Sequence, residues 1–205
     1  MRGAHFVIVA AIVLLPAGCT EINPRDKTPE LSQTEQNRAM RRHARELRAS
    51  REFRRALVEE EGMREQVYRD VAGYATVGVG HLVRSEDRLR VGDRVNRKRI
   101  ARFLEDDIRK AERSVAKVVG DLPLHQHEFD ALLDLVYNVG EGNVSPHRSP
   151  RLNRAIRSRD YEGIARELRY TTAKGARAAG LVFRSARRQR MFKEGKYDNP
   201  RSNES

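Results

Sequence analysis

The segment EEGMREQVYRDVAGYATVGVGH, residues 60–81, decides how this chain is interpreted. It begins where an apolar helical stripe ends, because Phe53, Leu57 and Glu61 are spaced four residues apart and share one helix face. Gly62 is a natural residue at which to leave that helix. Glu61 is therefore expected at the end of an apolar face, partly removed from water. Such surroundings disfavour a charged carboxylate and raise its pKa, as a general acid working near neutral pH requires.

The second half of the segment predicts a turn followed by a short strand. Gly73 suits the turn, and Asp70 stands at its start. The side chains of residues 74–80 alternate, so that three apolar side chains point to one face while Thr76 and two glycines point to the other. The hydroxyl of Thr76 is thus expected on a face where its neighbours are too small to block a ligand.

The remainder of the chain is predicted to be helical. Asn96 can cap a helix that keeps one apolar face from Ile100 to Val119 and ends at Gly120. Further helices are predicted over residues 129–140, 160–170 and 181–192. A short β region followed by helices indicates an α+β fold.

Three blocks of the sequence resemble the phage-type lysozyme family. Residues 60–81 are similar to its active-site signature, Glu-Gly, then Tyr-x-Asp, then Gly-x-x-Thr-x-Gly-x-Gly-His. FDALLDLVYNVG (Phe129–Gly140) resembles its central helix, and GLVFRSARRQRMF (Gly180–Phe192) resembles its C-terminal helix. The resemblance covers about residues 51–197. It implies a mostly helical, lysozyme-like α+β fold, with a small β-hairpin lobe and a larger helical lobe flanking a cleft.

The resemblance also implies the site residues. Glu61, Asp70 and Thr76 match the family's catalytic positions in residue type and spacing. Glu61 would protonate the leaving oxygen, while Asp70 and Thr76 would position water or stabilise positive charge. Whether Asp70 acts as a nucleophile or a water-positioning group stays open at this point. Tyr137 and Ser149 match positions that line the family's substrate cleft.

Some of these residues also have purely structural interpretations. Asp70 alone is typical of a turn, and Tyr137 alone is typical of core packing on a helix face. His81 is interpreted as structural, bonding the hairpin to the larger lobe. The sequence departs from the family at Ala75, where tryptophan or another aromatic residue is common before the catalytic threonine, and at Tyr170, where the aromatic residue is often tryptophan. Less aromatic surface predicts weaker stacking on sugars.

The N-terminal region differs in composition from the rest of the chain. The longest apolar run, FVIVAAIVLLPAG, spans residues 6–18 and precedes the single cysteine, Cys19. It is shorter than the roughly 20 residues that a membrane-spanning helix needs, and it suits a secretory signal. LPAGC also resembles a lipoprotein lipobox, although Pro16 departs from that pattern, and a signal-arrest segment is the alternative. Residues 1–19 are predicted to be an export signal or a membrane or lipoprotein anchor, placing the protein in the periplasm, at the membrane or in the cell wall.

Residues 20–50 are predicted to be a linker and a basic helical segment. The cationic stripe of that helix consists of Arg38, Arg41, Arg42, Arg45 and Arg48. The stripe would contact an anionic wall polymer or a membrane surface, and a solvated helical spacer is the alternative. The lysozyme-like domain is predicted over residues 51–197, and residues 198–205 are predicted to be a flexible tail.

The formal charge of +12 favours polyanionic partners. The leading hypothesis is an endolysin or lysozyme that hydrolyses the β-1,4 bond between N-acetylmuramic acid and N-acetylglucosamine in peptidoglycan, for phage lysis or wall remodelling. A non-catalytic wall-binding module and a nucleic-acid-binding protein are the alternatives, and no specific nucleic acid is expected. No cofactor is expected, since His125, His127 and Glu128 are interpreted as a helix start and not as metal ligands. The family resemblance implies a monomer.

Overall fold

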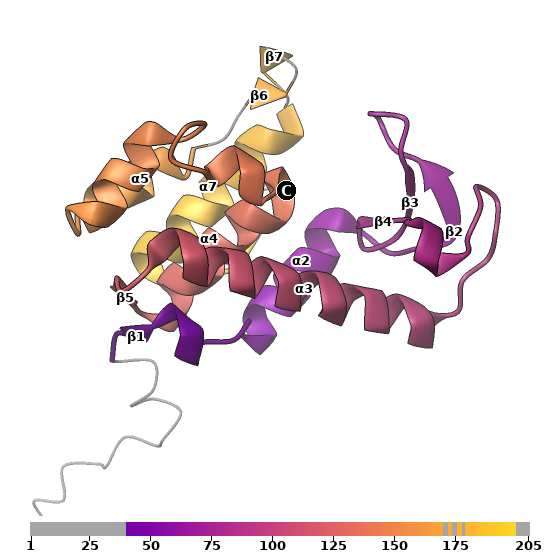
Figure 1. Cartoon of the computed structure of the whole chain (residues 1–205), viewed down its shortest axis with the longest axis horizontal. Coiled ribbons are helices and arrows are strands. Elements are labelled where there is room, and N and C mark those ends of the chain that lie inside the picture. The colour runs from indigo at the N-terminus through magenta and orange to yellow at the C-terminus, as the bar shows by residue number, and fades with distance from the viewer. Residues whose placement is uncertain (1–39, 170–171, 174–175, 178, 200–205) are drawn as a thin grey trace, which may run out of the picture.

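The computed structural model describes residues 40–169, 172–173, 176–177 and 179–199 of the chain. These residues form a mostly helical α+β fold with small antiparallel sheets, which confirms the predicted class. Figure 1 shows the hairpin of strands β2 (Arg64–Arg69) to β4 (His81–Leu82) at one end of the long helix α3 (Arg97–Val119). Helices α4 (Gln126–Val139), α5 (Pro150–Arg157) and α7 (Ala179–Glu194) lie towards its opposite end, and α2 (Arg51–Glu61) lies between the two groups. Within the described ranges, no helix is long and apolar enough to cross a membrane. The predicted export segment and most of the predicted linker, residues 1–39, lie outside the described residues.

Helix α2 (Arg51–Glu61) leads directly into the hairpin. It begins at Ser50, whose side-chain oxygen accepts a hydrogen bond from the Phe53 N–H at 2.9 Å. It ends at Gly62, whose φ of 67° favours glycine. The helix therefore ends where the sequence predicted, and Glu61 is its last residue.

Three strands build the small lobe: β2 (Arg64–Arg69), β3 (Ala75–Gly78) and β4 (His81–Leu82), paired antiparallel in the order β2-β3-β4. Strand β2 was not predicted from the sequence. Val77 is completely buried, and Gly78 packs closely against helix α3. A methyl group built on Gly78 would lie only 2.7 Å from Cγ2 of Ile100, so only glycine fits where the hairpin meets α3.

Two long helices form the centre of the larger lobe. Helix α3 (Arg97–Val119) begins at Asn96, whose Oδ1 accepts a hydrogen bond from the Arg99 N–H at 2.9 Å, and it ends at Gly120. Helix α4 (Gln126–Val139) contacts both α3 and α7 (Ala179–Glu194), and its Phe129 and Leu133 are fully buried. Two shorter helices, α5 (Pro150–Arg157) and α6 (Tyr161–Glu167), and the strand pair β6 (Thr172–Ala173) and β7 (Ala176–Arg177) complete the described fold.

The prediction of a basic helix before residue 51 is wrong for the residues that the structure describes. Strand β1 (Arg42–His43) pairs antiparallel with β5 (Pro123–Leu124), and a short 3-10 helix, η1 (Ala44–Glu46), follows it. The physical reason is that this segment has buried apolar side chains of its own, with Ala44 and Leu47 almost fully covered. It is part of the folded domain and not a solvated spacer.

Three arginines of the predicted stripe, Arg41, Arg45 and Arg48, lie within 4.0 Å of carboxylates, while Arg38 lies outside the described residues. Arg41 binds Glu128 at 2.7 Å, and its guanidinium lies 3.8 Å above the ring of Tyr161. The weaker pairs join Arg45 to Asp121 at 3.8 Å and Arg48 to Glu112 at 3.9 Å.

Candidate active site

Glu61 lies where α2 meets the last helix of the chain. Its side chain is 25% exposed, and Oε1 accepts a hydrogen bond from Nη1 of Arg184 on α7. The carboxylate is thus partly buried, as predicted, but its surroundings include a cation and are not simply apolar. Arg184 lies in the block Gly180–Phe192 that resembles the family's C-terminal helix, but the sequence alone predicts no role for it. Its position in an arginine-rich helix was the only available signal.

Arg184 belongs to a buried ionic cluster, defined here as Glu61, Arg184, Asp134 and Arg188. Asp134, on α4, accepts hydrogen bonds from Nη2 of Arg184 at 3.0 Å and from Nε of Arg188 at 2.6 Å. Burial opposes the ionised form of Asp134, but the charges of the two arginines outweigh it and lower the pKa. Two cations and two carboxylates balance within the cluster, so Arg184 holds Glu61 without leaving an uncompensated buried charge.

A second arginine fixes the last turn of α2 against α7. Arg187 is buried and donates to the main-chain oxygen of Ala56 at 2.9 Å. It also binds Glu59 at 2.9 Å and Glu60 at 3.4 Å. The backbone that carries Glu61 is therefore held in place by α7 as well as by its own helix.

The second carboxylate oxygen of Glu61 faces the hairpin lobe. A methyl group built on Gly80 would lie 3.6 Å from Oε2, so the absent side chain leaves that oxygen uncovered on this side. Tyr137, from α4, donates its hydroxyl to the main-chain oxygen of Val79 at 2.7 Å and holds this loop. Burial raises the pKa of Tyr137, and the charges of Asp107 and Glu61 raise it further, so the phenol remains a hydrogen-bond donor.

Asp70 holds the turn between β2 and β3. Its Oδ1 accepts hydrogen bonds from the N–H groups of Ala72 at 2.8 Å and Tyr74 at 2.9 Å. Gly73, with φ of 90°, donates its N–H to the main-chain oxygen of Asp70 at 2.9 Å. The structural role that the sequence assigned to Asp70 is confirmed.

Thr76 lies on β3, one strand away from that turn. Its side chain is buried, and its hydroxyl donates to the main-chain oxygen of Tyr74 at 3.2 Å. The face predicted to be open is thus largely covered at Thr76, and Ile100 closes it at Gly78. The reason is that α3 packs against the hairpin, which the strand alternation alone does not reveal.

His81 ties the hairpin to α3, as predicted. Its Nδ1 lies 2.7 Å from Asp107 and its Nε2 lies 3.3 Å from Asp87, while its ring stacks on Phe103 with centroids 4.0 Å apart. Burial acts to lower the pKa of His81, but the two carboxylates outweigh it and raise the pKa above the usual value.

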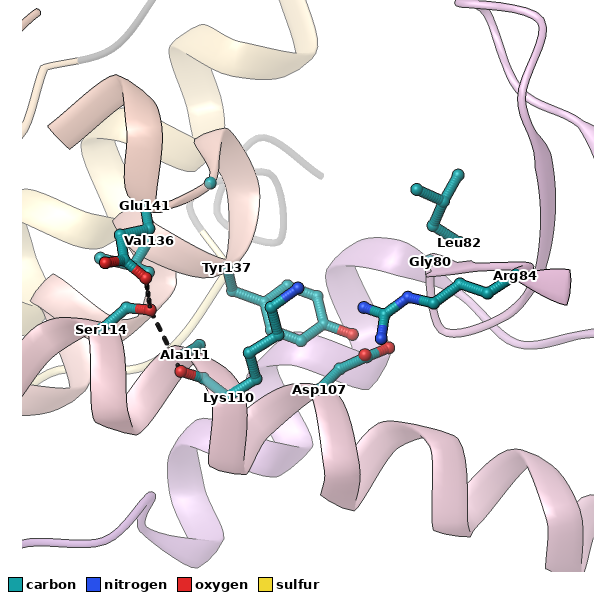
Figure 2. Close-up of a pocket in the computed structure, with 11 residues that line it drawn as sticks. Gly80, Leu82, Arg84, Asp107, Lys110, Ala111, Ser114, Val136, Tyr137 and Glu141 are labelled. Carbon is teal, nitrogen blue, oxygen red and sulfur yellow. Dashed lines mark hydrogen bonds between the residues drawn. The ribbon is translucent and has the colours of Figure 1, made fainter. Parts of the chain in front are cut away.

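A cavity of about 480 Å³ lies between the hairpin, α3 and α4 (Figure 2). Its lining residues are Gly80, Leu82, Arg84, Asp107, Lys110, Ala111, Ser114, Val136, Tyr137, Gly140 and Glu141. The cavity adjoins the carboxylate of Glu61 through Gly80, and Tyr137 is one of the residues that line it. Ser149 is not among the lining residues; it precedes α5, and its hydroxyl donates to the main-chain oxygen of Asn143 at 2.7 Å.

Two of the three residues considered as metal ligands, His127 and Glu128, have protein partners. Nδ1 of His127 lies 3.0 Å from the main-chain oxygen of Phe192, and Glu128 is bound by Arg41. Among the described residues, no group of three His, Cys, Asp or Glu side chains is arranged to hold a metal ion.

Comparisons with known proteins identify the family of this chain. The phage lysozyme family model matches residues 58–189. The endolysin of Salmonella phage P22 is 28% identical over 110 residues, which cover 53% of this chain and 73% of that protein. The endolysin of Acyrthosiphon pisum secondary endosymbiont phage 1 is 28% identical over 137 residues, covering 64% of this chain and 88% of that protein.

Solved structures show the same fold. The endolysin from Escherichia coli O157:H7 phage FAHEc1 superposes with a TM-score of 0.64 at 23% identity, covering 78% of this chain and all 100% of that one. The muramidase domain of SpmX from Asticaccaulis excentricus superposes with a TM-score of 0.61 at 24% identity, covering 72% and 98%. The lysozyme-like fold predicted from the sequence is thereby confirmed.

Proposed function

The chain belongs to the phage lysozyme family, and from that premise we propose that it cleaves the β-1,4 bond between N-acetylmuramic acid and N-acetylglucosamine in peptidoglycan, with Glu61 as the general acid. Family membership makes the chain a glycoside hydrolase of the lysozyme type, whose substrate is peptidoglycan. The bond that is cut and the residue that donates the proton are our proposal.

The observation that carries the assignment is the placement of the Glu61 carboxylate. Arg184 holds one oxygen, while the other faces Gly80 at the edge of the cavity. A general acid must be held within hydrogen-bond reach of the leaving oxygen, and a fixed carboxylate with one accessible oxygen meets that requirement.

Asp70 and Thr76 are proposed to serve the other half of the reaction from the hairpin. Asp70 is fixed through Oδ1 by two backbone N–H groups, which leaves Oδ2 to act on water or on the developing positive charge. Thr76 donates its hydroxyl proton to a main-chain oxygen, so its oxygen lone pairs are oriented to accept a hydrogen bond.

We also propose that the protein is exported across the inner membrane to act in the periplasm, at the membrane or in the wall. The support is the apolar run of residues 6–18 with Cys19 behind it. Fractionation of cells that express the full chain tests the proposal, and recovery of the protein from the cytosol alone would oppose it.

The catalytic proposal is tested by comparing the parent protein with Glu61→Gln on purified peptidoglycan. The parent is expected to release new reducing ends that mass spectrometry, after borohydride reduction, identifies as N-acetylmuramic acid. Glu61→Gln is expected to lower the rate by about 100- to 10,000-fold, because the N–H protons of the amide are not acidic enough to be transferred to the leaving oxygen.

Glu52→Gln is the matched control, since it is the same change in the first turn of the same helix, at the end opposite Glu61. It is expected to retain hydrolysis. Equal rates for the parent and Glu61→Gln would remove Glu61 from the proposed mechanism. A folded parent protein that binds peptidoglycan without cutting it would favour a non-catalytic binding module.

A further inference from the structure

The cavity beside Glu61 carries two cationic side chains on different elements. Lys110 extends from α3, and Arg84 follows strand β4 of the hairpin. Figure 2 shows both side chains reaching towards the space in front of Tyr137. Leu82 and Val136 supply apolar surface in the same cavity. The site therefore offers positive charge and apolar contact together.

The carboxylates that line the cavity are already engaged elsewhere. Asp107 is bound by His81 at 2.7 Å. Glu141 accepts a hydrogen bond from the Ser114 hydroxyl at 2.6 Å and pairs with Lys117 at 3.2 Å. Neither carboxylate forms an ion pair within 4.0 Å with a cation that lines the cavity.

The two cations are consequently open to a ligand. Within the part of the chain that the structure describes, Lys110 forms no ion pair within 4.0 Å. Arg84 has only a distant contact with Glu86, at 3.8 Å, where both side chains are well exposed. An exposed pair of this kind contributes little, so a carboxylate ligand can replace it at small cost.

We propose that Lys110 and Arg84 bind a carboxylate of the glycan substrate, so that the enzyme recognises the acidic groups of its polymer and not the sugar backbone alone. This inference rests on the proposed function and names the charged part of the substrate. Peptidoglycan carries such groups in two places, namely the peptide stems and the lactyl ether of a stem-free muramic acid. A cation paired with a carboxylate forms a short, strong hydrogen bond and fixes its orientation.

Binding of a carboxylate by these two cations positions the substrate relative to Glu61. Gly80 lines the cavity, and a methyl group built on it would lie 3.6 Å from Oε2 of Glu61, so a carboxylate held in the cavity is bound beside the proposed acid. Binding energy from a non-reacting group can then orient the glycosidic oxygen towards the acid.

The test measures binding with full-length protein carrying Glu61→Gln, so that the ligand is not hydrolysed during titration. Calorimetry compares soluble glycan fragments that keep their peptide stems, fragments stripped to free lactyl carboxylates, and the same two preparations with every carboxylate converted to a neutral amide. Adding Lys110→Gln is expected to weaken binding of a carboxylated ligand about tenfold, by loss of one charge-assisted hydrogen bond. For the amidated ligands, the affinities of Glu61→Gln with and without Lys110→Gln should differ far less.

Lys98→Gln is the matched control, because Lys98 is an exposed lysine on the same helix that does not line the cavity. Lys110→Arg keeps the charge and is expected to recover most of the affinity. An effect limited to stem-bearing fragments identifies the stem as the source of the carboxylate, and an effect limited to stripped fragments identifies the lactyl group. The inference is overturned if Lys110→Gln weakens binding of charged and amidated ligands equally, or of neither. Because binding is measured without turnover, a failure of hydrolysis in the parent protein would overturn the proposed function separately.

Discussion

The two carboxylates assigned to catalysis are held in opposite ways. Glu61 depends on residues distant in the sequence, since Arg184 lies 123 positions away and connects it to Asp134 inside the larger lobe. Asp70 depends on its own turn, where both N–H donors to its carboxylate lie within four residues. One group is fixed by buried charge and the other by local backbone geometry.

Because of this difference, substitutions that affect the two carboxylates are expected to lower the free energy of unfolding by different amounts. Removing the most deeply buried carboxylate of the ionic cluster, Asp134, leaves an uncompensated charge without water, which is among the most destabilising changes a protein can suffer. Altering a side chain in an exposed turn leaves solvent to satisfy what is lost. Substitutions among the residues that hold Glu61 should therefore lower the free energy of unfolding strongly, and substitutions in the turn that holds Asp70 should lower it weakly.

The largest expected effect comes from Asp134→Asn. The change leaves Arg184 and Arg188 buried with one carboxylate instead of two, and it is expected to lower the free energy of unfolding by about 3–5 kcal/mol. Urea denaturation of the parent and the variant measures the difference.

Glu105→Gln supplies the comparison, because Glu105 pairs with Arg54 at 3.0 Å where both side chains are more than a third exposed. Its cost is expected to be about 1 kcal/mol or less. Similar losses for the two variants would mean that burial of the cluster does not determine its importance.

An intermediate effect is expected at His81, which joins the two lobes through Asp107 and Asp87. Its pKa is raised in the folded protein, so the folded state binds the imidazole proton more tightly than the unfolded chain does. The resulting stabilisation is complete below the unfolded pKa of about 6.5 and is lost as the pH rises through the higher folded value. The difference in unfolding free energy between the parent and His81→Gln should therefore be larger at about pH 5.5 than at about pH 9.

His147→Gln is a suitable control, since His147 is exposed and has no ion pair among the residues that the structure describes. It is expected to change stability little at either pH. A pH-independent penalty for His81→Gln would assign the role of the imidazole to its stacking on Phe103 and not to its charge.

The structural features predicted correctly from the sequence are those that interactions between neighbouring residues determine. The end of α2 at Glu61, the turn at Asp70 and the Asn96 cap follow from short-range patterns, and the structure confirms all three. Arg184 could not be assigned, because no local pattern indicates that a helix packs its arginines against a carboxylate 123 residues away.

The same limit explains the error at the N-terminal basic segment. Arginine spacing predicted a cationic stripe, but it says nothing about carboxylates that the fold brings near. Glu128 lies 87 residues from Arg41 in the sequence and binds it through two hydrogen bonds, at 3.1 and 2.7 Å. The spacing of the arginines therefore predicted a cationic segment, but it could not predict which of these arginines pair with carboxylates.

The smallest expected effect on stability, Asp70→Asn, is the sharpest test of the comparison. Asparagine keeps an oxygen that can accept the same two N–H groups, so the free energy of unfolding should change by about 0.5 kcal/mol or less. Hydrolysis of peptidoglycan should nevertheless fall by about 100-fold or more, because the negative charge proposed to act on water or on the cationic transition state is gone. Asp70→Ala, which loses both the acceptor and the charge, should be less stable and equally inactive. If Asp70→Asn hydrolyses peptidoglycan at the parent rate, the turn is the whole role of Asp70, and the chemistry belongs to the carboxylate that the buried cluster holds.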